Sequence, residues 1–270
     1  MTAMTTPACL IIGVDNHVGA YLARLLDARG VALAGVGDNR LLARLGIADS
    51  VTPVTATDVA AAVAEARLIF AISDGSAERA DLLATGIDAA GNSARLIHVA
   101  DVADLAQSPV RASMARIAAA KNAGAEAVNV LLEAHDSRFG KRDTLTARII
   151  EAARAATSGE TRSVLEIIEP GPRDWGWTPE YVDAVQRLAA RERLVDMVVG
   201  SGHSLTAAEI TNAAFAFFRA NPAAHVRITG TGTSTPLVNP AALTAFIGWT
   251  ASTWGNDLIK ALCEGASDRT

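Results

Sequence analysis

The segment GVDNHVG, residues 13–19, places glycines at a predicted strand-to-helix junction, an arrangement that can bind a phosphate-containing ligand. Backbone N–H groups at the start of a helix attract an anion, and glycine lets the anion approach closely. Gly13 and Gly19 fit a dinucleotide-binding turn, and Asn16 between them tolerates left-handed backbone angles. A tight turn that only packs the helix on the strand explains the same residues equally well.

The end of the next predicted strand, GVGDNR, carries two side chains with opposite implications for a dinucleotide. A carboxylate such as Asp38 hydrogen-bonds the ribose hydroxyls and favours NAD, whereas an arginine such as Arg40 favours the 2′-phosphate of NADP. A simple surface turn is compatible with both residues. The sequence leaves the choice between NAD and NADP open.

Composition limits the partners of this chain of 270 residues, which has 24 basic and 29 acidic side chains and a net charge of −5. Without a basic excess, neither a nucleic acid nor an anionic membrane is expected as the main partner. Cys9, Cys263, His17, His203 and His225 match no metal-binding spacing, so no metal is expected and the thiols are expected to be free. The N-terminus has no basic segment and only a short apolar run, which predicts no signal peptide and a cytoplasmic location.

Short apolar runs alternate with amphipathic segments from residue 8 to residue 101. This pattern predicts an α/β fold, a Rossmann-type doubly wound parallel sheet with helices on both faces. We expect a first, dinucleotide-binding domain over residues 1–165 and a smaller C-terminal region over residues 166–270, interleaved with the first. The expected strands are 8–14, 31–38, 67–73 and 94–101, and the expected helices are 17–30, 58–66 and 78–91.

The second half of the chain is richer in predicted helices. From Val110 to about His135 the alanine-rich pattern predicts one long helix, whose broad small-residue face favours a homodimer built by a four-helix contact. A helix with the capping pair Thr206 and Glu209 is also expected. The remaining expected elements are a strand over 163–171 and helices over 144–156, 178–192, 206–220 and 254–264.

Several segments resemble motifs of the GDP-mannose 4,6-dehydratases, which are extended short-chain dehydrogenase/reductases. The segments are TARI (146–149), RDWGWTPEYV (173–182), VDMVVGSGHSLTAAEI (195–210), LVNPAALTAFIGWT (237–250) and NVLLEAHDSR (129–138). The last resembles an Asn-His-Glu-Ser loop, with Ala134 in place of the asparagine. The glycine turn has the spacing G-x-x-G-x-x-G of these enzymes, with Asn16 in the middle position.

The resemblance implies a Rossmann domain for NADP or NAD, a C-terminal region for a GDP-sugar such as GDP-mannose, and a dimer. In such enzymes hydride leaves sugar C4 for the nicotinamide, water is lost across C5 and C6, and hydride returns to C6. The cofactor-binding residues implied by the resemblance are Gly13, Asn16, Gly19, Asp38, Arg40, Lys121 and His135, and the substrate-binding residues are Arg148 and Arg173.

The catalytic part of the resemblance is incomplete. The family's Tyr-x-x-x-Lys pair aligns with SMARIAAAKN, where Lys121 is retained and Ile117 replaces the tyrosine. The family's Thr and Glu after the preceding strand align with Val102 and Asp104. Loss of a general base typically costs about 10² to 10⁴ in rate. This alignment predicts a degenerate site, with Asp104 or Lys121 as the groups left to move a proton.

The substrate side is also altered, because Thr229 lies where the family has a diphosphate-binding arginine, and Arg227 lies two residues away. The loops after the second strand and around the catalytic strand are shortened as well. Because Gly13, Gly19 and the strand-turn-helix frame are retained while Asn16 replaces the middle glycine, weak dinucleotide binding is expected.

Structural roles explain several of the retained residues. Lys121 fits a solvated helix position, and His135 fits a buried, hydrogen-bonded histidine. Arg173 and Asp174 fit an ion pair beside Trp175 as a core aromatic residue.

Three functions remain open. The first is a nucleotide-sugar-binding homologue that keeps a cofactor site but is inactive as a dehydratase. The second is an active NAD(P)-dependent dehydratase or epimerase with a non-standard proton-transfer group. The third is a non-catalytic partner of an intact paralogue.

Overall fold

The computed structural model describes residues 8–157 and 163–267, so the expectation for the first seven residues lies outside the described part. The chain divides into two compact units. Unit 1 comprises Met1–Glu133 and Tyr181–Val199, and unit 2 comprises Ala134–Glu180 and Gly200–Thr270. The expected boundary near residue 165 thus differs from the observed one, since the chain leaves unit 1 after Glu133 and returns to it at Tyr181.

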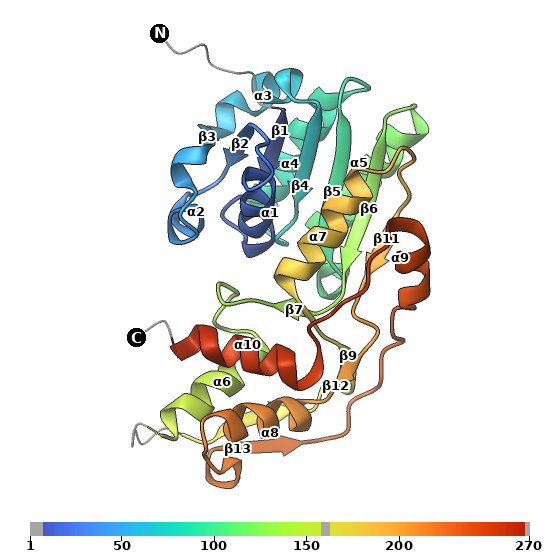
Figure 1. The fold of residues 1–270 in the computed structure, drawn as a ribbon. Helices are drawn as coiled ribbons and strands as arrows, with labels where there is room; N and C mark the ends of the chain where they lie inside the picture. Colours follow the sequence, from blue (N-terminus) through green and yellow to red (C-terminus); the bar gives the residue numbers. More distant parts are fainter. Residues whose placement is uncertain (1–7, 158–162, 268–270) are drawn as a thin grey trace. The chain divides into compact units, whose positions relative to one another are not determined.

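Unit 1 is built on a parallel sheet of seven strands, in the order β11-β6-β5-β4-β1-β2-β3 (Figure 1). Buried apolar runs form its central strands, as expected for a sheet covered on both faces. This confirms the predicted Rossmann-type α/β class. The strands are β1 (Cys9–Ile12), β2 (Leu33–Val36), β3 (Val51–Val54), β4 (Leu68–Ile72), β5 (Arg95–Asp101), β6 (Ala127–Leu132) and β11 (Met197–Val199).

Helices connect these strands and cover the sheet. Apolar side chains of α3, α4 and α5 form one core with the facing side chains of β1, β4 and β5. On α1, Val18, Leu22 and Leu26 are buried, and Arg29 just beyond it pairs with Asp183 of α7 at 3.2 Å. The helices are α1 (His17–Asp27), α2 (Arg40–Arg44), α3 (Val59–Glu65), α4 (Ala77–Ala90), α5 (Ser108–Asn122) and α7 (Thr178–Ala189), of which α7 begins in unit 2.

The long helix expected from Val110 to His135 is wrong. The helix α5 ends at Asn122, and the chain then passes through Gly124, whose φ of +97° suits glycine, into strand β6. Short runs such as AVNVLL have the apolar content of a buried strand and of a buried helix alike. In the structure, Ala127–Leu132 form strand β6 of the sheet and do not continue the helix.

Unit 2 has a core of its own formed by α6, α8 and α10. The predicted capping box is confirmed, because the hydroxyl of Thr206 accepts from the Glu209 backbone N–H while the Glu209 side chain accepts from the Thr206 backbone N–H. The helices are α6 (Leu145–Ala155), α8 (Ala207–Phe217), α9 (Pro240–Ile247) and α10 (Gly255–Ser267). The short strands are β7 (His135–Asp136), β8 (Leu165–Ile168), β9 (Arg173–Asp174), β10 (Gly176–Trp177), β12 (Ser204–Leu205) and β13 (Val226–Thr229).

Within the described residues, no helix combines the length and apolarity needed to cross a membrane. Both cysteines are buried thiols, and burial raises the pKa of each to about 12.

Candidate functional site

The glycine turn lies at the carboxyl end of β1, where the backbone enters α1. Gly13 has a φ of +110°, and a Cβ on Gly19 would collide with the carbonyl oxygen of Gly13. The turn therefore needs glycine at both positions, because the first turn of α1 lies directly against the strand end. Asn16 caps the helix, with its side-chain oxygen accepting from the Val18 N–H at 2.8 Å.

This turn is at the point where the strand order reverses. The chain moves from β1 to β2 and β3 on one side, and then returns to β4 on the other side of β1. Open α/β sheets bind ligands outside the carboxyl ends of the strands at such a point. The predicted residues Gly13, Asn16 and Gly19 are together there.

An ion-pair cluster that sequence reasoning missed spans the same strand ends. The Arg79 guanidinium, from the first turn of α4, donates through Nη2 to Asp15 Oδ1 at 2.5 Å and through Nε to Asp74 Oδ2 at 3.4 Å. The Arg79 side chain is only 7% exposed. The position of Asp15 inside the glycine turn was the one local signal for this cluster.

Asp38 and Arg40 lie beyond the carboxyl end of β2, as predicted, and they bind each other. Asp38 accepts from the Arg40 backbone N–H at 2.7 Å and from Arg40 Nε at 2.9 Å. These bonds hold the pKa of Asp38 below its usual value. Both side chains are exposed.

Val102 and Asp104 follow the carboxyl end of β5, at the same edge of the sheet as the glycine turn. Asp104 Oδ1 accepts from Gln107 Nε2 at 2.7 Å. Asp104 is thus a partly buried carboxylate at the edge of the sheet where a bound dinucleotide would lie.

Lys121 lies near the amino ends of the strands, whereas the glycine turn lies at their carboxyl ends. This position corrects its predicted role in cofactor binding and proton transfer. It is in the last turn of α5 and pairs at 3.0 Å with Asp196, which also accepts from the backbone N–H of Asn129 near the amino end of β6. A strand rises about 3.3 Å per residue, so the length of the sheet separates Lys121 from Gly13. Ile117 is fully buried in the core beneath the sheet. The spacing of Ile117 and Lys121 matches the family pair, but α5 carries Lys121 to the amino ends of the strands, away from the glycine turn.

Neither α5 nor the segment after β5 carries a tyrosine that could transfer a proton. The chain contains two tyrosines. Tyr21 lies on α1 and Tyr181 lies on α7, and both are buried. Neither belongs to α5 or to the segment that follows β5.

A buried polar chain crosses three strands of unit 1. His98 on β5 is hydrogen-bonded at 2.8 Å to Ser73 Oγ, just beyond β4, and at 2.8 Å to Asn129 Oδ1 on β6. Because the amide oxygen of Asn129 accepts, His98 carries its proton on Nδ1 and accepts the Ser73 hydroxyl proton at Nε2. Burial lowers the pKa of His98 to about 4, so the imidazole is neutral at pH 7.

In unit 2, His135 and Asp136 are buried in β7. His135 Nδ1 is hydrogen-bonded to Thr178 Oγ1 at 2.8 Å. The Asp136 carboxylate accepts from the Ser137 backbone N–H at 2.7 Å and from the hydroxyls of Thr144 and Thr146. Burial raises the pKa of Asp136, and these donors oppose that rise. The acid anchors the loop that leads from β7 to α6.

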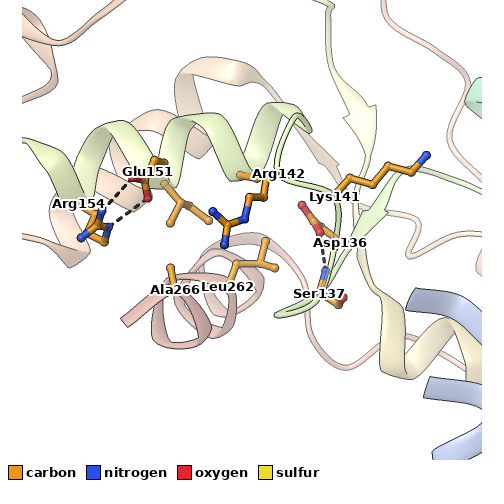
Figure 2. A pocket seen from close by; sticks show the side chains of 11 residues that line it. Asp136, Ser137, Lys141, Arg142, Glu151, Arg154, Leu262 and Ala266 are labelled. Atoms are coloured by element: carbon orange, nitrogen blue, oxygen red, sulfur yellow. Dashed lines mark hydrogen bonds and ion pairs between the residues drawn. The ribbon is translucent and has the colours of Figure 1, made fainter. Parts of the chain in front are cut away.

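This loop borders two cavities of unit 2. The first, of about 240 Å³, lies between α6 and α10, and Figure 2 shows Arg142 pointing into it while Lys141 points away and Glu151 binds Arg154. The second, of about 550 Å³, is lined by Arg142 and Glu151 together with the predicted Arg148. Arg142 thus lines both cavities.

The motif RDWG has structural contacts. Asp174 is buried and accepts from the Ser201 N–H at 2.8 Å and the Gly202 N–H at 2.7 Å. Trp175 belongs to the core of unit 2, as expected for a structural aromatic residue. The predicted substrate residue Arg173 lines neither cavity.

Thr229, which stands where the resemblance expects a diphosphate-binding arginine, and the nearby Arg227 both lie on β13. Arg227 pairs with Glu166 at 2.8 Å on the neighbouring strand, and Thr229 ends β13. In the described ranges, no group of three or more His, Cys, Asp or Glu side chains could hold a metal ion.

No protein-family model matches the sequence, and no curated protein matches it. Solved structures do match over nearly the full length. An NAD-dependent NDP-hexosamine 5,6-dehydratase of tunicamycin biosynthesis, TunA, is 17% identical with a TM-score of 0.80, covering 98% of this chain and 99% of its own. The dTDP-glucose 4,6-dehydratase of Bacillus anthracis, in complex with NAD, is 10% identical with a TM-score of 0.79, covering 96% of each chain.

The UDP-glucuronic acid 4-epimerase of Bacillus cereus, in complex with UDP-glucuronic acid and NAD, is 11% identical with a TM-score of 0.79, covering 97% of this chain and 99% of its own. The fold is that of these dehydratases and epimerases. At these identities the likeness establishes a shared fold.

Proposed function

We propose that the chain binds a nicotinamide dinucleotide at the glycine turn of unit 1 and a nucleotide sugar in unit 2, and that it does not catalyse tyrosine-dependent 4,6-dehydration. The observation that carries the proposal is the close approach of Gly13 and Gly19 at the strand-order reversal, which leaves no space for a Cβ on Gly19. When bound, such a cofactor accepts hydride from a sugar and returns it. The similar structures support the proposal, since their names include NAD and nucleotide sugars.

NAD is the proposed cofactor rather than NADP. This choice is supported by Asp38, since a carboxylate beyond the second strand accepts from ribose hydroxyls and disfavours a 2′-phosphate, and by Arg40, whose Nε donates to Asp38. Calorimetry should give an NAD⁺ affinity about tenfold higher than that for NADP⁺. Tighter binding of NADP⁺ would assign the ribose site to Arg40 instead.

The proposed substrate is a nucleotide sugar, with GDP-mannose as the first candidate from the sequence resemblance. The cations Arg142 and Arg148 line the cavity of about 550 Å³ in unit 2, a size that suits a nucleotide, and Arg142 also enters the smaller cavity. GDP-mannose, UDP-glucose and dTDP-glucose should be compared by thermal shift, because a bound ligand raises Tm by mass action.

Catalysis is tested separately from binding. Asp104 is a carboxylate just beyond the carboxyl end of β5, and α5 supplies no tyrosine beside it. We expect no 4-keto-6-deoxy product from GDP-mannose by mass spectrometry, with or without NADP⁺ or NAD⁺, while an intact dehydratase run alongside gives product. Turnover comparable to that control would show that another group, with Asp104 the first to test, moves the proton.

We further propose a homodimer, now through α5 alone. Its outward face carries the exposed small residues Ala112, Ala115 and Ala119. Small residues allow two helices to approach closely in a four-helix contact.

A further inference from the structure

Arg79 contacts the glycine turn, and its guanidinium is almost fully buried there. Its backbone N–H bonds to the Ser76 hydroxyl at 3.1 Å at the start of α4, so the position of the residue is fixed. Its side chain extends across the strand ends to Gly13, and a Cβ on Gly13 would lie 3.2 Å from Nη1. This places the guanidinium at the strand-order reversal, beside the turn itself.

The hydrogen bonds of the guanidinium are incomplete. Nη2 and Nε have carboxylate partners, but Nη1 is buried and has no hydrogen-bond partner within residues 8–157 and 163–267. Buried donors are rarely left unpaired in a purely structural ion pair. The two carboxylates are more exposed to solvent than the guanidinium, since the side chains of Asp15 and Asp74 are 35% and 27% exposed.

Asp15 occupies space over the turn. It lies between Arg79 and Gly37, where a Cβ would collide with the Asp15 carboxylate. At the same time Asn16 uses the Val18 N–H, one of the amides that a helix start offers to an anion. The turn therefore offers fewer amide donors than a glycine at position 16 would allow, and it has a cation that could replace them.

We propose that Arg79 is the cationic anchor for the diphosphate of the bound dinucleotide, and that Asp15 accepts from the same guanidinium until a diphosphate replaces it. The edge of the guanidinium formed by Nη1 and Nη2 supplies two parallel donors, which matches two phosphate oxygens. Asp74 keeps Nε and holds the arginine in place during the exchange. The inference rests on the proposed dinucleotide binding and names the residue that makes it possible in a turn without its middle glycine.

The test is calorimetry of the full chain with NAD⁺ and with ADP, for wild type, Arg79→Lys and Asp15→Asn. Lysine keeps the charge but loses the paired donors, so we expect Arg79→Lys to weaken both affinities by about 10- to 100-fold. Asp15→Asn removes a competing negative charge and should strengthen both by about tenfold. Arg116→Gln, a change in an exposed arginine paired with Asp88 on α4, is the matched control and should leave both unchanged.

The outcomes separate the inference from the proposed function. Equal affinities for wild type and Arg79→Lys, with NAD⁺ still bound, would remove Arg79 as the anchor and leave dinucleotide binding intact. Binding by Asp15→Asn alone would support the inference. No binding by any variant at millimolar NAD⁺ would overturn both proposals. If Arg79→Lys does not fold, Asp15→Asn decides the matter, because a failure to gain affinity contradicts the exchange.

Discussion

At the scale of single residues, the neutral buried histidine of unit 1 has the clearest consequence. His98 is fully buried, and its hydrogen bonds to Ser73 and Asn129 use both ring nitrogens. Its pKa of about 4 in the folded chain is lower than the value of 6.5 of an exposed histidine. The unfolded chain therefore binds a proton at a pH where the folded chain does not.

This difference predicts a stability that falls as the pH falls from about 6.5 towards about 4. Between pH 7 and pH 5 the His98 contribution should decrease by about 2 kcal/mol. Urea unfolding at both pH values should show that His98→Gln, which keeps a neutral hydrogen-bonding group, loses less stability on acidification than wild type. The raised pKa of Asp136 acts in the opposite direction, but it is common to both proteins and cancels. Identical pH dependence of the two proteins would contradict the buried neutral imidazole.

At the scale of elements, the packing of α1 on the end of β1 depends on a position where no side chain fits. A Cβ on Gly19 would collide with the Gly13 carbonyl, which is backbone and cannot rotate away. Gly30, beyond the end of α1, has no atom within 4 Å of the space for a Cβ and a φ of +72°.

Gly19→Ala should therefore lower the free energy of unfolding by about 1–3 kcal/mol through overpacking and should abolish NAD⁺ binding. Gly30→Ala, the control, should cost about 1 kcal/mol through its backbone angle alone and leave binding unchanged. Urea midpoints and calorimetry provide both readouts. An equal loss of stability and of NAD⁺ affinity in the two variants would mean that the close approach at Gly19 has no effect on the turn.

At the scale of the whole molecule, the exposed alanine face of α5 predicts self-association. Ala115 is exposed at the middle of the helix, so Ala115→Arg should place a large charge in a dimer contact without disturbing the core. Light scattering should give a dimer mass for wild type and a monomer mass for Ala115→Arg. Ala61→Arg on the exposed side of α3 is the control and should remain dimeric. A wild-type monomer at high concentration would contradict the proposal.

The order of strands and helices in unit 1 could be read from the sequence because it depends on local periodicity. Buried runs such as CLII and RLIHVAD, separated by helical spacing, already specify a parallel sheet covered on both faces. The glycine turn was predictable for the same reason, since strand, glycines and helix are contiguous from Cys9 to Gly19. The capping box at Thr206 is likewise a pattern of four consecutive residues.

The tertiary structure alone decided which of these residues are near one another. Lys121 matched a catalytic spacing, but spacing within one helix does not specify which edge of the sheet that end of the helix reaches. Arg79 and Asp15 are 64 positions apart, so their pairing depends on where β4 returns beside β1. Likewise, the alanine-rich run continues past Gly124 in pattern, and pairing with β5 and β11 makes the later part a strand. Local periodicity determines most elements of unit 1, whereas the end of α5 and the contacts that form the site arise from hydrogen bonds and burial between segments distant in the chain.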